Sequence, residues 1–335
     1  MRKLLTLMLT VIFCFTVVVP GFAAGLNPQT APEKLAVVEK YLYGTEQAGA
    51  LIPRTNSLEM DVYGAQTSDP ILTRIDNVYV YIFGTPGTAT ASFATKLNIV
   101  EWQLLQKMSD KPARTRLDEV ETMLNGKVAT TSAATRLDEL MRLAFPSATL
   151  STEAVVLPKD TLLKIEFTEA LKSKENRAGD TVHFQMADNL YVGEVLVLPK
   201  GATGYGTVKK IVQAGSFGRD ARIDIEFTNI LAVDGTAIPV IMGELAKQQA
   251  ETAAGAAGAS IGGMILLGPV GAIGGAFVTG KSVTIPVGTV TFVQTNADVN
   301  INGIVHEGGS SAGHQPVIGQ LPQDKAPAEP ETTVN

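Results

Sequence analysis

The sequence predicts a multidomain α+β protein. It has an N-terminal array of helical repeats, followed by an antiparallel β-barrel or sandwich with an inserted glycine-rich helical hairpin. Three observations lead to this prediction. Basic residues recur about every 20 positions between residues 31 and 146, each followed by the apolar spacing of a helix. After residue 157 the apolar period changes to two, which is typical of strands. Residues 252–280 then form a run of 29 positions without a charge.

Residues 1–23 have the pattern of a secretory signal peptide. Arg2 and Lys3 precede an uncharged apolar stretch over residues 4–19, and Gly21 and Ala23 place small residues at positions −3 and −1 of a cut after residue 23. A cut after residue 24 or 25 fits almost as well, and an uncleaved anchor is the alternative. Cleavage removes Cys14, the only cysteine, and with it any disulfide. We expect an exported protein in the periplasm or outer membrane of a bacterium.

Six tandem repeats fill residues 31–146, and each contains one basic residue, with spacings of 20, 20, 22, 20 and 20. The basic positions are Lys34, Arg54, Arg74, Lys96, Arg116 and Arg136. Apolar residues stand one, four and eight positions after each, except for Thr55, and they form one stripe of a helix. Five repeats then end in Gly or Pro. Because such short helices are marginal alone, we predict three helical hairpins in an array or compact bundle.

Charged residues flank the predicted helical stripe. Glu occurs five positions after the basic residue in four repeats, at Glu39, Glu59, Glu101 and Glu121. The simplest interpretation is that these charges are solvated, so that Arg116→Gln changes stability by less than about 0.5 kcal/mol. The array then serves as a spacer or a protein-docking surface. The alternative is that the repeated charges form a ladder that binds cell-wall polymer.

Residues 157–302 have the short alternating strands and regular turns of an antiparallel barrel or sandwich, preceded by a linker at 147–156. Alternation is visible at 163–168, 182–186, 223–227 and 290–293; in the last stretch Val290 and Phe292 alternate with Thr291 and Val293. A turn with Pro second recurs at 157–161, 198–202 and 285–289, and its fourth residue is Gly in two of the three copies. Pro fixes φ and Gly permits positive φ, so we interpret this turn as a strand entry without a chemical role.

The uncharged run at 252–280 interrupts the strand pattern. Small residues recur every four positions at Gly258 and Gly262 and again at Gly271 and Gly275, which is a spacing that allows close helix packing. Gly268-Pro269 divides the run into segments too short to span a bilayer singly. We expect a glycine-zipper hairpin that contacts a membrane. The alternatives are packing against the protein's own β-domain and self-association in a homo-oligomeric ring.

A series of short motifs in this stretch carries a resemblance to a known family. The motifs are residues 157–163 (LPKDTLL), 198–202 (LPKGA) with 204–206 (GYG), 218–219 (GR) before 222–225 (RIDI), and 233–236 (VDGT). Over residues 157–302 this pattern resembles the C-terminal β-domain of TrbI-type subunits of conjugation and type IV secretion channels. The resemblance implies envelope protein partners, and an inserted hairpin that enters the outer membrane. The N-terminal part resembles short tandem helical repeats of secreted bacterial proteins.

Several function classes lack their sequence signatures. No nucleophile-elbow, zincin, P-loop or dinucleotide motif occurs, so we expect no enzyme and no cofactor. His306 and His314 lie at or in a Gly/Ser-rich tail without fixed ligand geometry, so we expect no metal, and residues 307–335 are predicted to be disordered. The net charge of −6 with scattered basic residues argues against nucleic acid. We therefore expect a non-enzymatic envelope scaffold; the alternative is a soluble periplasmic peptidoglycan-binding module.

Overall fold

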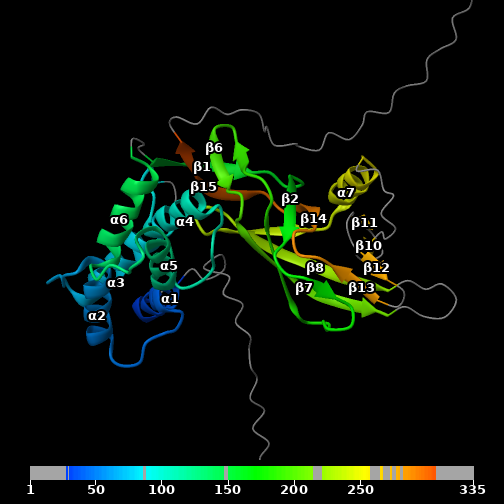
Figure 1. The fold of residues 1–335 in the computed structure, drawn as a ribbon. Coiled ribbons are helices and arrows are strands. Elements are labelled where there is room, and N and C mark those ends of the chain that lie inside the picture. The colour runs from blue at the N-terminus through cyan, green and yellow to red at the C-terminus, as the bar shows by residue number, and fades with distance from the viewer. Residues whose placement is uncertain are drawn as a thin grey trace, which may run out of the picture.

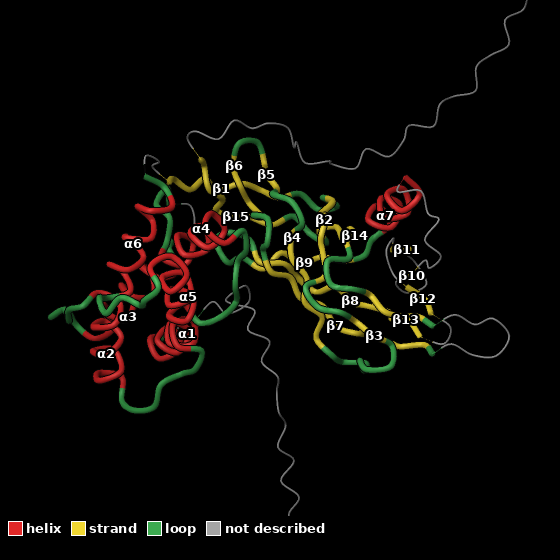
Figure 2. The backbone as a smooth tube through the Cα atoms, in the orientation of Figure 1, coloured by secondary structure: helices red, strands yellow, loops and turns green. Residues whose placement is uncertain are grey.

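The chain divides into a helical array and a β-rich part that lie next to each other (Figure 1). The computed structural model describes residues 28, 30–85, 88–146, 150–213, 221–256, 265–266, 272–273, 277–279 and 282–306. Helices α1–α6 gather on one side, and the strands and α7 on the other (Figure 2). The predicted α+β class is therefore confirmed. The signal-peptide pattern at 1–23 and the tail at 307–335 lie outside the described residues.

Six short helices form the array, and each begins three residues before its repeat's basic residue. They are α1 (Ala31–Tyr43), α2 (Leu51–Tyr63), α3 (Ile71–Phe83), α4 (Phe93–Leu105), α5 (Ala113–Asn125) and α6 (Ala133–Ala144). Gly44, Gly64 and Gly126 end α1, α2 and α5 in the left-handed region, as the breaker positions predict. In α4 the left-handed residue is Gln106, which explains why this repeat lacks a breaker.

The predicted apolar stripe is the core of the array. Leu35, Val38 and Leu42 of α1 are at most 1 % exposed, and the equivalent residues of most other helices are buried as well. Thr55, the exception in the pattern, is also buried, and its hydroxyl donates to the carbonyl of Leu51 at 2.8 Å. At the end of α5 the stripe reaches the surface.

The helices group in threes. Helix α1 packs mainly on α3, and α4 packs mainly on α6, while α1 also contacts α5 and α2 contacts α6. The expected three hairpins are therefore wrong. The loop between α3 and α4 is longer than the others, which matches the one longer spacing, between Arg74 and Lys96, and marks the boundary between two triplets.

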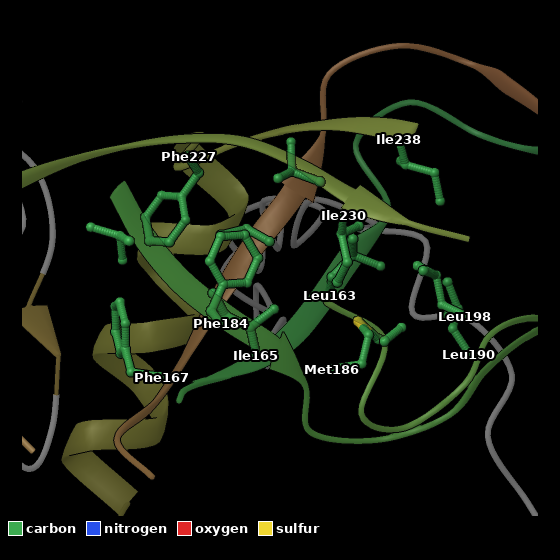
Figure 3. Close-up of a cluster of buried hydrophobic side chains, with 14 of the residues drawn as sticks. Leu163, Ile165, Phe167, Phe184, Met186, Leu190, Leu198, Phe227, Ile230 and Ile238 are labelled. Atoms are coloured by element: carbon green, nitrogen blue, oxygen red, sulfur yellow. The ribbon is translucent and has the colours of Figure 1, made fainter. Parts of the chain in front are cut away.

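A closed six-stranded barrel is the centre of the β-rich part, as predicted. Its strands follow the order β14-β2-β4-β7-β8-β9, and all neighbours are antiparallel. They are β2 (Leu162–Phe167), β4 (Thr181–Met186), β7 (Thr203–Val212), β8 (Arg222–Leu231), β9 (Ala237–Ile241) and β14 (Val290–Thr295). Phe167, Phe184 and Phe227 fill the interior together with aliphatic side chains (Figure 3).

In strand β14, the side chains that point into the barrel are the alternate ones to those we predicted. In β14, Thr291 and Val293 are buried, whereas Val290 is 37 % exposed. The cause is register: Val293 lies opposite the inward Leu163 of β2, and residues paired across a ladder point to the same face. Apolar residues at both parities of β14 make the alternation ambiguous in the sequence.

A second sheet lies between the barrel and the helices, with strand order β1-β15-β6-β5. The strands are β1 (Leu150–Leu157), β5 (Leu190–Val192), β6 (Val195–Leu198) and β15 (Val299–His306). Most of the expected linker at 147–156 is thus strand β1, which pairs with β15 along its whole length. Strand β1 lies at the edge of this sheet and mixes polar and apolar residues. Because of this mixture, its sequence resembles that of a linker.

The three copies of the recurring Pro turn share a backbone feature. The fourth residue has positive φ in each, at Asp160 (61°), Gly201 (83°) and Gly288 (79°). In the first and third copies the Thr that follows donates its hydroxyl to the carbonyl of the turn's Pro at 2.7 Å. The predicted strand-entry role is confirmed.

Among its described residues, the uncharged run is helical only at its beginning. Helix α7 (Glu244–Ala256) ends inside it, and the later described residues form the short strands β10 (Ile265–Leu266), β11 (Ala272–Ile273) and β12 (Phe277–Thr279). Strand β12 pairs with β13 (Ser282–Ile285), which in turn pairs with β3 (Leu171–Lys172). The described residues therefore do not form the predicted helical hairpin. β-Branched residues such as Ile273, Val278 and Thr279 have low helix propensity and favour strands.

The buried stripe gives a matched pair of substitutions within α5. Leu117 is fully buried, whereas Leu124, seven residues later, is 38 % exposed. Leu117→Asp should unfold the array because it buries an unpaired charge, while Leu124→Asp should leave the array folded. Far-UV circular dichroism at 25 °C measures both. Equal helix content in the two variants would contradict this assignment of the core.

Candidate functional site

Four of the six predicted basic positions form ion pairs with the preceding helix. Each arginine binds the Glu that stands five positions after the basic residue of the preceding repeat. The pairs are Arg54–Glu39 (2.6 Å), Arg74–Glu59 (2.5 Å), Arg116–Glu101 (2.7 Å) and Arg136–Glu121 (2.8 Å). The four glutamates are at most 3 % exposed. The pairs join α1 to α2, α2 to α3, α4 to α5 and α5 to α6.

Each of these carboxylates also holds the loop that follows its own helix. It accepts the backbone N–H of the residue eight positions later, from Gln47, Thr67, Ser109 and Ala129. One glutamate thus connects its own helix, the following loop and the next helix. We call this arrangement the carboxylate clamp.

The two lysine positions close each triplet instead. Lys34 of α1 pairs with Asp76 of α3 at 2.7 Å, and Lys96 of α4 pairs with Asp138 of α6 at 3.8 Å. Both pairs are partly exposed, so they are weaker than the clamps. In both, the aspartate stands two positions after the basic residue of the third helix, so the array consists of two equivalent halves.

The interpretation of the repeat charges as solvated flanks is therefore wrong. The basic residue and the Glu lie beside the apolar stripe, and the short loops fold the next helix over them, which buries both. The alternative, a ladder of charges free to bind cell-wall polymer, does not hold at these four arginines either, because each is paired with a glutamate. The constant spacing between each Glu and the arginine of the next repeat is the sequence signal for the clamps.

Two clamp residues, Arg116 and Glu59, show how the partner favours the charged form. Burial by itself would lower the pKa of Arg116, but Glu101 outweighs this effect and the pKa is raised. Burial likewise favours the neutral form of Glu59, yet hydrogen bonds from Arg74 and Thr67 hold its pKa below the usual value. At both residues the partner's charge and hydrogen bonds therefore outweigh the effect of burial on the pKa.

One clamp continues into the β-rich part. The Nη2 of Arg116 also donates to Oδ1 of Asn98 at 2.6 Å, and Nδ2 of Asn98 donates to the carbonyl of Val233 at 2.8 Å. All three residues are buried. Asn98 was not singled out in the sequence because its importance depends on a contact 135 residues away.

Further hydrogen bonds follow this interface, which we call the seam. Trp102 of α4 donates to Asn189, and the backbone N–H of Met108 donates to the carbonyl of Gly201 at 3.2 Å. Tyr205 donates its hydroxyl to Asp110, and burial together with this carboxylate raises the pKa of the tyrosine. The apolar core of the array includes side chains of β6 and β15. The array and the second sheet are therefore packed as one body.

The four glycines of the predicted zipper cannot be placed. Gly258, Gly262, Gly271 and Gly275 lie outside the described residues. Within the described part of the chain, no helix combines the length and apolar character needed to cross a bilayer.

Comparison with known proteins gave matches among solved structures. No family model matches the chain, and no curated protein matches it. Among solved structures, the chain is similar to ComB10 of the Com type IV secretion system of Helicobacter pylori, with 15 % sequence identity and a TM-score of 0.25. The similarity covers 43 % of this chain and 89 % of that chain. Likeness at this level does not bear on function, which we infer from the residues of the chain itself.

The clamp predicts a large effect of one arginine and a small effect of its neighbour. Arg116→Gln should lower the free energy of unfolding by about 3–5 kcal/mol, because it leaves Glu101 buried without its counter-charge. Arg114→Gln removes a pair with Asp61 in which both side chains are about half exposed, and should cost less than about 1 kcal/mol. Urea denaturation compares the two. Equal losses would show that the clamp adds no more than a surface pair.

The seam predicts a difference between two glycines with the same backbone conformation. Gly201 and Gly288 both have φ near +80°, so Ala is strained at either by about 1–2 kcal/mol. A Cβ on Gly201 would in addition lie 2.5 Å from Cα of Lys107 across the seam, whereas a Cβ on Gly288 meets nothing within 4 Å. Gly201→Ala should therefore lower the melting temperature more than Gly288→Ala. Identical melting temperatures would argue against a close seam.

Proposed function

We propose that this protein is an exported, non-enzymatic component of the bacterial cell envelope. It acts as a scaffold that associates with the outer membrane, or with an envelope protein complex, through residues 252–280. The signal-peptide pattern at residues 1–23 supports export. The observation that carries the proposal is the place where the uncharged segment joins the folded part of the chain.

The uncharged segment is attached to the barrel on the side away from the array. Helix α7 and strands β10–β13 lie at the end of the molecule opposite α1–α6 (Figure 1). Helix α7 is fixed on the barrel, where Ala246 is fully buried and its N–H donates to Oε1 of Gln294 at 3.2 Å. The amide of Gln294 in turn donates to Asp160 at 2.6 Å. Contacts made through 252–280 therefore leave the array free to extend in the other direction.

The composition of the segment supports contact with lipid or with a second copy of the chain. It has no charge anywhere between Glu251 and Lys281, so insertion into an apolar environment does not bury an unpaired ion. The small residues at Gly258, Gly262, Gly271 and Gly275 permit close backbone approach in a homo-oligomer. An envelope protein with a matching apolar surface is the other partner that this composition suits.

The peptidoglycan-binding alternative loses its simplest support. It relied on free charges repeated along the array, but four of the six basic side chains are committed to carboxylate clamps. Retention of the purified protein by peptidoglycan would revive this alternative.

Two deletions of equal length test the proposed function in the native host. One replaces residues 252–280 by a short Gly/Ser link, and the other deletes the tail at 307–335, so both remove the same number of residues. The first deletion should shift the protein from the outer-membrane fraction to the soluble periplasm, because the membrane-contacting segment is gone. The second should leave the distribution unchanged. Cell fractionation and immunoblotting measure both.

Two outcomes would contradict the proposal. One is that the protein without residues 252–280 still pellets with the outer membrane at the wild-type level. The other is that the wild-type protein already lies in the soluble fraction. A circular dichroism spectrum of the purified deletion variant separates loss of membrane contact from loss of folding.

A further inference from the structure

Strand β1 is an edge of the second sheet, and its outer side is open over part of its length. It pairs with β15 on one side, and no described strand lies on the other. The loop between α3 and α4 covers the start of the open side, where the N–H of Thr152 donates to the carbonyl of Ala89 at 3.1 Å. Pro158 follows the last residue of the strand. Residues 153–157 between these two limits have no described strand beside them.

The backbone groups on the open side belong to Ala154 and Val156. Residues along a strand bond alternately to one side and the other. The N–H of Thr152 points to the open side, so the N–H groups of Ala154 and Val156 do as well. The neighbouring strand agrees, because Asn302 lies across from Ala154 and donates its N–H to Asp234, away from β1. In the described part of the chain no hydrogen bond reaches these groups of Ala154 and Val156, so they are available to a further strand.

The side chains on this stretch do not protect the edge. Natural edge strands usually carry Lys, Pro or a bulge, but residues 153–157 contain neither residue. Ala154 is exposed, and Val156 is 50 % exposed. Both lie on one face, where Ala154 also lines a cavity of about 510 Å³ at the seam. Apolar side chains across from Ala154 and Val156 would cover surface that is otherwise in water.

A single charge marks the other face of the stretch. Glu153 is exposed and lies on the same face as Val155, which packs against the barrel core. Among the described residues, Glu153 has neither an ion pair nor a side-chain hydrogen bond. Opposite charges that face each other across two strands stabilise the pairing. A Lys or Arg across from Glu153 therefore complements this edge.

A second copy of β1 is a poor occupant of the open side. Two antiparallel copies that satisfy all the free groups pair Ala154 with Val156 across a twofold axis. The same register brings Pro158 of the second copy across from Thr152, where Ala89 already lies. It also places Glu153 across from a leucine rather than a cation. A segment of another protein that ends or bends away before the loop avoids both problems.

We propose that residues 153–157 form a strand-addition site for an extended segment of a protein partner. The segment pairs with the open side of β1, with apolar residues across from Ala154 and Val156 and a Lys or Arg across from Glu153. Main-chain hydrogen bonds supply the affinity, and the alternating side chains supply the specificity. This proposal does not depend on membrane association through residues 252–280.

Titration with short synthetic peptides tests the site, using the chain from residue 24 onward. Acetyl-SVTVKS-amide places its two valines and its lysine across from Val156, Ala154 and Glu153 when it binds antiparallel. Acetyl-SKVTVS-amide does the same when it binds parallel. One of the two should bind with a Kd of about 1 mM or tighter by calorimetry. Absence of binding by both peptides would overturn the proposal.

Hydrogen exchange resolved to single amides tests the location. In the free chain, the amides of Ala154 and Val156 should exchange about tenfold faster or more than those of Glu153 and Val155, which face β15. The peptide should slow exchange of the first pair and leave the second pair unchanged. If the peptide bound without slowing the first pair, the site would lie elsewhere. If the first pair were already protected in the free chain, another segment or a second copy would occupy the edge, and the proposal would be wrong.

A charge reversal with a matched control tests the chemistry of the partner. In Glu153→Lys, the binding peptide with Glu in place of its Lys should bind about two- to fivefold more tightly than the original peptide. Glu194→Lys makes the same change at an exposed position between β5 and β6, at the other edge of the sheet, and should keep the preference for the Lys peptide. The same preference in both variants would rule out pairing across from Glu153.

A proline substitution tests the main-chain bonds. Ala154→Pro removes an N–H that faces the open side and does not bond to β15, so the sheet should stay folded. Binding should weaken about fivefold or more, because one hydrogen bond to the peptide is lost. Circular dichroism checks that the variant is folded. Undiminished binding by the folded variant would show that the peptide does not add to β1 as a strand.

Discussion

The array depends on placing a carboxylate where water cannot reach it. A buried glutamate is tolerable only if a cation and hydrogen-bond donors replace its hydration, and here the next repeat supplies the cation. Each clamped helix is therefore incomplete without its successor, in addition to being too short to be stable alone. The clamps are missing where one triplet meets the other, and partly exposed Lys–Asp pairs connect the first and third helix of each triplet instead. Stability is thus organised in two halves that share an apolar core.

The same constraint joins the array to the rest of the chain. Because Arg116 satisfies both Glu101 and Asn98, and Asn98 reaches the backbone of Val233, the clamp between α4 and α5 cannot be disturbed without affecting the β-rich part. Gly201 allows the loop after α4 to approach the strand-entry turn closely. A firm seam holds α1–α6 in a set direction relative to α7 and β10–β13. That is the property a scaffold between an envelope surface and a partner would need.

Local periodicity was enough to predict the helices and most of the barrel. The stripe that contains Leu35 and Val38 specifies which face of a short helix is buried, and the alternation at 163–167 does the same for β2. The alternation did not predict which face of β14 is buried, because apolar residues occupy both faces. Only the pairing of Val293 with Leu163 determines which face points inward. Strand β1 resembles a linker in the sequence, and only its pairing with β15 shows that it is a strand.

The charges were harder to interpret than the apolar residues. A lone Arg or Glu beside a helical stripe is usually solvated, and burial depends on the position of the neighbouring helix. The constant spacing from each Glu to the arginine of the next repeat contained this information, but its meaning requires the loop geometry. Residues such as Asn98 and Asp110, whose partners lie 135 and 95 residues away, have no local signature at all.

Unfolding of the wild-type protein tests most directly whether the array and the β-rich part form one body. Trp102 is the only tryptophan, and it lies on the seam with its indole N–H bonded to Asn189. Its fluorescence reports the seam, far-UV circular dichroism at 222 nm reports mainly the helices, and near-UV circular dichroism reports the packing of all aromatic rings, including those in the barrel. In increasing urea, the three signals should change in one coincident transition. If the fluorescence changed at a lower urea concentration, with the helices and the barrel unfolding later and separately, the seam would not be what unites this structure.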